Sequence, residues 1–443
     1  MLKTFKPGGI HPAENKLSAK EAIKVPGIPK TVFIPVAQHI GAPSVPVVKR
    51  GDTVKVGQLI AKSGGFVSAN THSSVSGKVK KIDTIPDSSG YRKQGIVIDV
   101  EGDEWEESID TSENLVGQFD LTPEEIINAI TQAGVVGLGG ATFPTHVKLM
   151  PPKGMKAEVL IVNGVECEPY LTSDHRLMLE KADEILVGTR LLMKAMKVDK
   201  AYIGIENNKP DAIQLLRQKI QGGTHIEIVA LKVRYPQGGE KQLIKAITGK
   251  EVPSGGLPIA VGAVVSNVGT AFAVYEAVQK KKPLVERVVT VTGKSVGKPS
   301  NFKARIGTPV SVLVNAAGGT PEDTGKIISG GPMMGKAIAN LDVPVTKGTS
   351  GILLMKSSES KRKKTISCIR CSRCVSVCPM GLEPYLLQTV SEKQMWGPAE
   401  EGNIMDCIEC GSCSYTCPSN RPLLDYIRLG KGKVGQIMRT RKS

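Results

Sequence analysis

The chain has 443 residues, of which 40% are hydrophobic and 23% are charged, and its formal net charge is 58 − 42 = +16. This length predicts two to four domains, and the composition is typical of globular domains. A basic surface suits nucleic acid, an anionic membrane face or an acidic protein partner. Aromatic residues make up only 4%, and no finger or recognition-helix motif occurs, so nucleic acid is disfavoured as a partner.

The beginning of the chain predicts a cytoplasmic location. The first residues, "MLKTFKPGGIHPAENK", lack the apolar core of a signal peptide, and thiols in the cytoplasm are reduced. A later stretch, Leu257 to Val278, is long enough to span a bilayer. Because Pro258, Asn267 and Glu276 interrupt it, we predict a buried strand, turn and helix instead. The chain would then reach a membrane only through its partners.

Residues 1–115 are predicted to form a small β domain. Short strand-like segments between about 31 and 101 include "VPVVKRGDTVKVGQLIAK" and "SSVSGKVKKI", with turns at Gly51 and Gly57. The pattern "GDTVKVGQ…SGKV" resembles the flattened β-barrel of lipoyl and biotinyl carrier domains. Those domains carry a modified lysine at a hairpin tip. The matching stretch here, Ser63 to Ser74, has no lysine, so the resemblance implies a carrier-like barrel without the swinging arm.

Residues 116–285 alternate strand-like and helix-like segments, which predicts an α/β domain with a largely parallel sheet. In "LTPEEIINAITQAG", Thr122 is the expected N-cap, Pro123 and Glu125 occupy favourable first-turn positions, and Gly134 is the expected stop. One amphipathic helix is predicted over residues 173–197. Ligands of such sheets bind at the carboxyl ends of the strands.

The remaining chain divides into three parts. Residues 286–355 are β-rich and resemble the soluble-ligand-binding β-grasp module. Residues 356–364, "KSSESKRKK", are either a solvated linker or a docking patch for an acidic partner. Residues 365–443 are predicted to form a cysteine-rich helical domain, with a basic tail that is either disordered or in contact with anionic lipid.

Two near-copies of one cysteine string dominate this last part: "CIRCSRCVSVCP" and "CIECGSCSYTCP". The spacing C-x2-C-x2-C-x3-C-P is the signature of bacterial ferredoxins, in which the fourth cysteine binds the other cluster. Zinc sites usually use separated cysteine pairs or include histidine, and neither string has a histidine nearby. The remaining Cys167 is either a small buried residue or a reactive thiol. The predicted ligands are Cys368, Cys371, Cys374 and Cys417 for one [4Fe–4S] cluster and Cys407, Cys410, Cys413 and Cys378 for the other.

Clusters carry single electrons, so another site must supply or remove them. The candidate is the glycine-rich stretch from Gly134 to Lys148, "GVVGLGGATFPTHVK", where glycines permit close approach to a phosphate or a flat ring. It is not the nicotinamide G-x-G-x-x-G motif. Polar residues follow the later strands, at Asn163, Glu166, Glu168, Glu240, Asn267 and Thr270. Each fits ordinary turn chemistry, and together they fit one pocket.

Four segments in order resemble the flavin- and NADH-binding subunit of respiratory complex I: "GLGGATFPTHVK", "VNGVECEP", "GGEKQLI" and "SNVGT". A closer resemblance is to the RnfC family. Its members are subunits of Rnf complexes, which are membrane-bound ferredoxin:NAD+ oxidoreductases that transport ions. It rests on the barrel, "GGATFPTHVK", "NGVECEPYLTSDHR", "ISGGPMMG" and the paired cysteine motif. This second resemblance covers essentially the whole chain.

The resemblance implies FMN, NAD(H) as substrate and two [4Fe–4S] clusters. Flavin can exchange electron pairs with nicotinamide and single electrons with clusters, so no side-chain acid or base is expected to be catalytic. It also implies a peripheral subunit on the cytoplasmic face of the membrane, in a complex that couples electron flow to Na+ or H+ transport. The implied partners are other subunits, including an iron–sulfur subunit, and, indirectly, ferredoxin. The residues implied around FMN are Gly137, Gly139, Gly140, Lys148, Asn163, Glu166, Glu240, Asn267 and Thr270, and those around the dinucleotide are Phe143 and Glu168.

Three residues depart from the complex I pattern. Leu138, Val165 and Lys241 stand where that family has arginine, aspartate and glutamate. They motivate an alternative function, an electron relay with a degenerate, flavin-free pocket that binds a quinone or a partner. A third hypothesis is a non-redox interaction protein with structural zinc.

Overall fold

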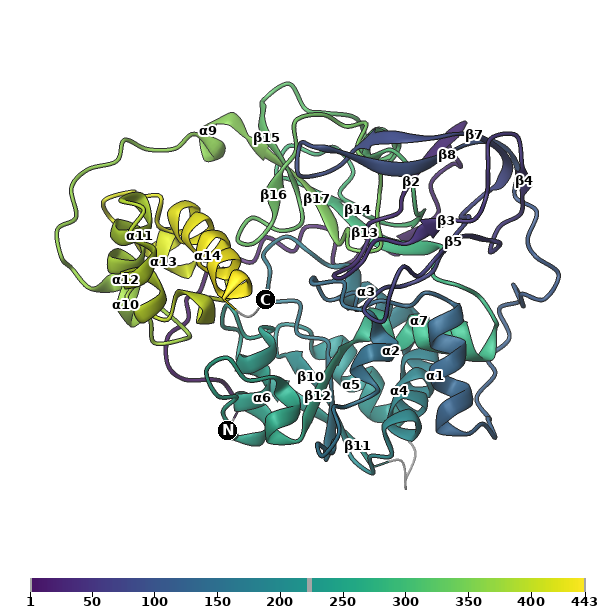
Figure 1. Ribbon diagram of the computed structural model, residues 1–443, viewed down its shortest axis with the longest axis horizontal. Helices are drawn as coiled ribbons and strands as arrows, with labels where there is room; N and C mark the ends of the chain where they lie inside the picture. Colours follow the sequence, from purple (N-terminus) through teal and green to yellow (C-terminus); the bar gives the residue numbers. More distant parts are fainter. Residues whose placement is uncertain (1, 221–224, 442–443) are drawn as a thin grey trace.

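The computed structural model describes residues 2–220 and 225–441. Its helices and strands form four regions (Figure 1). An α/β domain carries two β-rich domains above it, and a small helical domain, yellow in Figure 1, lies beside both at one end of the molecule. This arrangement confirms the predicted combination of α/β and β domains in one multidomain chain.

The N-terminal β domain consists of two antiparallel sheets. The apolar side chains of Val32, Ile34, Ile60, Ile96 and Ile98 fill the space between them and are fully buried. Alternating inward and outward residues along each strand produce this sandwich. One sheet has the order β2 (Thr31–Pro35), β8 (Arg92–Gly102), β7 (Ser76–Pro86) and β4 (Thr53–Val54), and the other has β3 (Val45–Pro46), β5 (Leu59–Lys62) and β6 (Thr71–His72).

The α/β domain is built on a four-stranded sheet in which every neighbouring pair is parallel. Its strands are continuous apolar runs, as expected for a sheet that helices cover on both faces. All four strands end at the same edge, which places their following loops together. The sheet order is β11 (Ile226–Leu231), β10 (Ala201–Glu206), β9 (Val159–Asn163) and β12 (Ala263–Asn267).

The helices of this domain confirm most of the local predictions. Thr122 and Glu125 form a capping box at the start of α1. The stretch from Leu257 folds as a 3-10 turn, strand β12 and helix α7, as predicted. The single helix predicted over residues 173–197 is wrong, because Lys181 leaves helical geometry at φ −132° and ψ 37° and separates two helices. The helices are α1 (Pro123–Gln132), α2 (Thr145–Lys148), α3 (Ser173–Glu180), α4 (Ala182–Met196), α5 (Pro210–Lys219), α6 (Glu240–Thr248) and α7 (Val268–Gln279).

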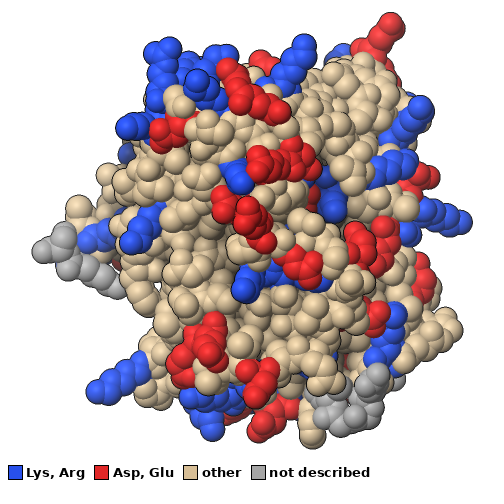
Figure 2. Space-filling view, turned by 90° about the vertical axis from the view of Figure 1, so that its right-hand side faces the viewer, with Lys and Arg blue, Asp and Glu red and all other residues tan. Residues whose placement is uncertain are grey.

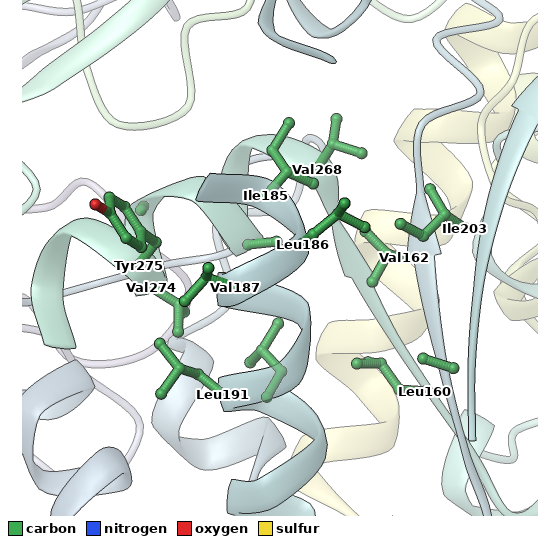
Figure 3. Close-up of a cluster of buried hydrophobic side chains, with 14 of the residues drawn as sticks. Leu160, Val162, Ile185, Leu186, Val187, Leu191, Ile203, Val268, Val274 and Tyr275 are labelled. Atoms are coloured by element: carbon green, nitrogen blue, oxygen red, sulfur yellow. The ribbon is translucent and has the colours of Figure 1, made fainter. Parts of the chain in front are cut away.

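The main hydrophobic core lies between the sheet and helices α4 and α7 (Figure 3). Leu160 and Val162 of β9 face Ile185 of α4 in this core. The two helices approach closely at Gly188, where an added Cβ would lie 1.9 Å from the carbonyl oxygen of Ala271. This packing fixes the N-terminus of α7 at the strand-end edge of the sheet.

The third region is a six-stranded mixed sheet with helix α8 (Val310–Ala316) against it. Its order is β1 (Ile23–Lys24), β14 (Ser300–Arg305), β13 (Glu286–Thr292), β17 (Gly351–Lys356), β15 (Thr324–Ser329) and β16 (Lys336–Ala337). The edge strand β1 comes from the N-terminal segment. This segment starts at the edge of the α/β sheet, where Lys3 pairs with Leu231, and runs past the helical domain before it reaches β1 (Figure 1).

The C-terminal domain is helical and follows an exposed connector. In it, α11 packs against α14 around Leu387, Val390 and Ile427. The predicted basic tail belongs to α14 as far as Thr440, and its last two residues lie outside the described part of the chain. Among the described residues, none of the helices is long and apolar enough to cross a membrane. Its helices are α10 (Arg373–Ser376), α11 (Pro384–Glu392), α12 (Trp396–Glu401), α13 (Ser412–Thr416) and α14 (Leu423–Thr440). The short helix α9 (Ser357–Ser360) precedes the connector and packs on β15 and β17 of the mixed sheet.

The positive net charge is not gathered into one patch on the face formed by the barrel and the α/β domain. Figure 2 shows basic and acidic side chains interspersed over this face. Many basic side chains of the protein are paired with acidic ones, for example Lys250 with Glu158 at 2.7 Å and Lys219 with Asp183 at 2.6 Å. Such mixed charge gives solubility without a strong local field.

Candidate redox site

The glycine-rich loop lies over the N-terminus of α7. Gly137 N–H donates to the Phe143 carbonyl at 2.8 Å, which closes the loop. Leu138 N–H donates to Thr270 Oγ1 at 2.9 Å. At Gly140, φ is +137° and no heavy atom lies within 4 Å of the position that a Cβ would take. The backbone at Gly140 therefore faces open space beside the first turn of a helix, where an anionic group is favoured.

Asn267 is the residue around which this edge is organised. Its Oδ1 caps α7 by accepting from the N–H groups of Gly269 and Thr270. Its Nδ2 donates to the Asn163 carbonyl at 3.2 Å and to Asp174 Oδ2 at 2.7 Å. One amide side chain thus joins the ends of β9 and β12 to the start of α3.

Lys148 and Glu240 complete the polar group at the strand ends. Lys148 Nζ donates to Glu240 Oε1 at 2.8 Å and to the Val265 carbonyl at 2.9 Å. Asn163 Nδ2 donates to the Gly238 carbonyl at 2.9 Å. The predicted flavin residues on the glycine loop and on the ends of β9, β12 and α6 therefore lie together, with an ammonium available for a phosphate.

Glu166 and Glu168 have different surroundings. The Glu166 carboxylate accepts from the N–H groups of Asp174 and His175 and caps α3. The Glu168 carboxylate accepts from the N–H groups of Met333 and Met334, at 3.1 and 2.7 Å, on a loop of the mixed-sheet domain. Burial raises the pKa of Glu168 to about 7. Glu166 thus shapes the edge of the pocket, and Glu168 fastens two domains together.

Asp174 belongs to this site, although no local sequence pattern pointed to it. It is buried against Asn267, and burial together with the charge of Glu166 raises its pKa to about 7. The motif "TSDHR" contains it, yet only the fold brings it to Asn267, 93 residues away. A buried carboxyl group of this kind can hold a proton near neutral pH.

The three departures from the complex I pattern have partners of their own. Leu138 and Val165 are buried, and their carbonyls accept from Arg287 and from Lys209 Nζ at 2.7 Å. Lys241 Nζ donates to the Pro253 carbonyl at 3.2 Å. These side chains leave the contacts of Asn163 and Asn267 intact.

The cysteines fall into two groups. Cys378, Cys407, Cys410 and Cys413 line one cavity in the helical domain, with Leu382, Leu387 and Ile427 among its apolar walls. Cys374 and Cys417 lie beside the same apolar core, and Cys368 and Cys371 are exposed. One predicted ligand set therefore lines a single cavity, and the other set lies outside its lining, with two members exposed.

The buried group fits a cluster by the chemistry of its donors. Four thiols face one apolar cavity, and three of them come from one string while Cys378 comes from the other. Burial raises the pKa of Cys407 to about 11 and of Cys413 to about 12. Metal binding to such thiols must release their protons. Within the described ranges, no three or more His, Cys, Asp or Glu side chains lie close enough together to hold a single metal ion.

One short segment connects the two sites. Tyr235 O–H donates to the Cys410 carbonyl at 2.8 Å. Five residues further on, Glu240 contacts Lys148 at the strand-end pocket. Gln242 then reaches back to the Pro379 carbonyl at 3.4 Å. Residues 235–242 thus contact the buried cysteine group at both ends and the pocket in between.

Four family models match the chain in the order of these domains. They are the RnfC barrel sandwich hybrid domain at residues 3–103, the Nuo51 FMN-binding domain at 130–276, the SLBB domain at 288–337 and the 4Fe-4S dicluster domain at 360–418. A parallel α/β pocket with an FMN-binding domain and eight clustered cysteines defines a flavin and iron–sulfur electron-transfer protein.

Curated relatives narrow this class to a family. The chain is 50% identical over 98% of its length to the RnfC component of the "Proton-translocating ferredoxin:NAD(+) oxidoreductase complex" of Clostridium ljungdahlii, and it covers 94% of that protein. It is 46% identical over 97% of its length to the RnfC component of the "Na(+)-translocating ferredoxin:NAD(+) oxidoreductase complex" of Acetobacterium woodii, and it covers 97% of that protein. The chain belongs to the RnfC family, whose members are subunits of ion-translocating ferredoxin:NAD+ oxidoreductase (Rnf) complexes.

A solved structure shares the fold. An NAD+-reducing [NiFe]-hydrogenase in the H2-reduced state superposes with a TM-score of 0.50 at 19% identity, over 72% of this chain and 66% of that chain. At this identity the likeness shows the shared architecture of the domains.

Proposed function

We propose that this chain is the peripheral NAD(H)-binding electron-transfer subunit of its complex, on the cytoplasmic face of the membrane. The names of the two relatives described above state different translocated ions, protons and Na+, but both state ferredoxin and NAD+. The shared chemistry is therefore assigned to this chain, with coupling to Na+ or H+ transport in its partner subunits. Among the domains, we infer a carrier-type barrel without the lysine arm, a Rossmann-like flavin domain, a β-grasp domain and a ferredoxin-like domain.

The pocket at the strand ends is the proposed flavin site. FMN, when bound, supplies the exchange between two-electron nicotinamide chemistry and one-electron cluster chemistry. Gly137, Gly139 and Gly140 present backbone to it, and the space beside Gly140 supports this role. Lys148 would bond the phosphate in exchange for part of its contact with Glu240. Asn163, Glu166, Asn267 and Thr270 hold the edge of the pocket in place.

Phe143 and Glu168 are the proposed dinucleotide residues. Phe143 is half-buried on the glycine loop, where an aromatic ring can stack on a flat ligand. Glu168 accepts from the N–H groups of Met333 and Met334, and the remaining lone pairs of its carboxylate can accept from dinucleotide hydroxyls. The proposed dinucleotide contact therefore lies at the junction of the flavin and β-grasp domains.

The connection through residues 235–242 is the observation that carries the proposed function. It supports an electron route from the flavin pocket to the buried cluster of Cys378, Cys407, Cys410 and Cys413, and from there to the outer cluster of Cys368, Cys371, Cys374 and Cys417. Buried ligands suit the internal relay, and exposed Cys368 and Cys371 suit exchange with another protein. The reverse direction uses the same order.

The surface around the outer cluster supports an acidic iron–sulfur subunit as the partner that exchanges electrons there, and ferredoxin as the indirect one. Residues 356–376 contain seven basic side chains and one carboxylate, Glu359. Residues 361–373 are all exposed. A basic rim around an exposed redox centre accelerates encounter with an acidic partner.

Anaerobic purification with quantitation of iron, sulfide and flavin tests the proposal. We expect about eight iron atoms per chain, since two [4Fe–4S] clusters are proposed, together with one FMN and NADH-to-ferricyanide activity. Two clusters without flavin or NADH binding would instead support the flavin-free relay. Zinc in place of iron would support a structural role for the cysteines.

A further inference from the structure

The N-terminal segment, residues 3–10, lies between the flavin domain and the cluster domain. Ile10 pairs with Tyr235 through two backbone hydrogen bonds of 2.8 and 2.9 Å. One residue earlier, Gly9 N–H donates to the Val377 carbonyl at 2.9 Å. The segment thus bonds directly to the backbone of both domains, and we refer to it as the N-terminal strap.

Gly8 brings the strap against a proposed cluster ligand. Its φ is +71°, and an added Cβ would lie 2.5 Å from both the carbonyl carbon and the carbonyl oxygen of Cys378. The nitrogen of Pro379 would be 2.7 Å away. Only glycine allows this approach, because both the positive φ and the backbone contact exclude a side chain.

Tyr235 contacts the second cysteine string, at Cys410. Its side chain is 2% exposed and packs in a buried cluster with Ile10 and Cys410. Its hydroxyl donates to the Cys410 carbonyl at 2.8 Å and lies near the Glu168 carboxyl. The Tyr235 side chain therefore joins the flavin domain to the second string.

We propose that Gly8 and Tyr235 are positioning residues that clamp the buried cluster against the flavin domain, and that the Tyr235 hydroxyl raises the reduction potential of that cluster alone. This inference rests on the proposed function. The Tyr235 hydroxyl points the positive end of its dipole at the backbone carbonyl of Cys410 rather than at its sulfur. A positive dipole end near a cluster stabilises the more negative, reduced state. Gly8 and Tyr235 each contact one of the two strings, so the clamp fixes both parts of the crossed ligand set.

Tyr235→Phe tests the electrostatic half of this proposal. It keeps the ring in its packing and removes the hydroxyl, with its bond to the Cys410 carbonyl and its interaction with the Glu168 carboxyl. Tyr275→Phe is the matched control, because Tyr275 is also buried in the flavin domain and its hydroxyl accepts from a backbone N–H, that of Val116, at 3.1 Å. The measurement is an EPR-monitored redox titration of the full, anaerobically purified chain.

In Tyr235→Phe we expect both clusters and the flavin to be retained and the midpoint of one cluster to fall. At the wild-type midpoint, its ratio of reduced to oxidised form should decrease at least about threefold, while the other cluster is unchanged. Tyr275→Phe should alter neither. Unchanged midpoints in Tyr235→Phe, or an equal shift of both clusters, would overturn the electrostatic role.

Gly8→Ala tests the clamp in a way that does not require cofactors. Gly249→Ala is its control, with a similar φ of +76° and nothing within 4 Å of the added Cβ. Limited proteolysis in the exposed basic connector, residues 361–364, separates the cluster domain from the rest of the chain. The fragment should stay bound in the wild type and in Gly249→Ala, and dissociate in Gly8→Ala.

The flavin content and the release of the fragment distinguish a failure of the clamp from a failure of the proposed function. If the chain holds no flavin but the fragment is released only by Gly8→Ala, the clamp stands and the proposed function fails. If flavin and clusters are present and Gly8→Ala retains the fragment as tightly as Gly249→Ala does, the clamp is refuted and the proposed function stands.

Discussion

The proposed crossed ligation of the two cysteine strings predicts the iron content of cysteine variants. Cys378 belongs to the first string by sequence, but it lines one cavity with three cysteines of the second string. We therefore expect Cys378→Ala to remove the buried cluster and to leave the outer one. The chain should fall from about eight iron atoms to about four, since each cluster holds four.

Double variants distinguish crossed from uncrossed ligation without assigning any spectrum. Cys378→Ala combined with Cys413→Ala affects one cavity, so about four iron atoms should remain. Cys378→Ala combined with Cys374→Ala affects both groups, so close to none should remain. Uncrossed ligation predicts the opposite result for the two pairs.

The assay is iron and acid-labile sulfide per chain in anaerobically purified protein, with FMN per chain as the control for folding. The flavin domain has a separate hydrophobic core, so its flavin content should stay constant across the series. About four iron atoms in the Cys374 pair together with almost none in the Cys413 pair would refute the crossed assignment.

Three further predictions concern the flavin domain and its neighbour. Gly188→Ala should destabilise the chain by about 1–3 kcal/mol in chemical unfolding, because the added Cβ would overpack against α7; Gly432→Ala, at an open position of α14, should be neutral or slightly stabilising. Lys148→Gln should raise the FMN dissociation constant about tenfold through loss of a charged phosphate contact, whereas Lys250→Gln, which removes a similar ion pair elsewhere, should leave it unchanged. Burial lowers the pKa of His72 from 6.5 to about 3. Only the unfolded chain binds this proton between those values, so the unfolding free energy should fall by up to about 1.4 kcal/mol per pH unit on acidification, and His72→Gln should reduce that slope.

The sequence predicted features whose signals lie within one segment. The capping box at Thr122 requires residues three apart, and the interrupted apolar stretch from Leu257 contains its own Pro and Asn. The cysteine spacing and the glycine loop are equally local. Such patterns identify elements and chemistry because the physics that determines them acts over a few residues.

Contacts between domains left no comparable local pattern in the sequence. Tyr235 and Cys410 are separated by 175 residues, and nothing in "YPQGG" distinguishes a turn from a junction. The strand β1 has only two residues, too few for periodicity, and it joins a sheet whose next strand begins at Ser300. The break at Lys181 was also missed, because the sequence around it, "LEKADE", contains no Gly or Pro to mark the end of a helix.

The short distance along the chain between the two sites has a physical consequence. Tyr235 and Glu240 are five residues apart, so their Cα atoms are at most about 18 Å apart even in an extended chain. The turn in which Gly239 N–H donates to the Pro236 carbonyl at 2.9 Å shortens this further. One loop therefore limits the separation of the flavin pocket from the buried cysteine group, and neither domain can move away alone while Tyr235 remains bonded to Cys410. The N-terminal strap supports the same contact from the other side, at Cys378. A hinge that opened this junction would have to break the strap and the loop together. We therefore expect any domain motion of this chain to occur at the exposed connector of residues 361–364, which precedes the outer cluster.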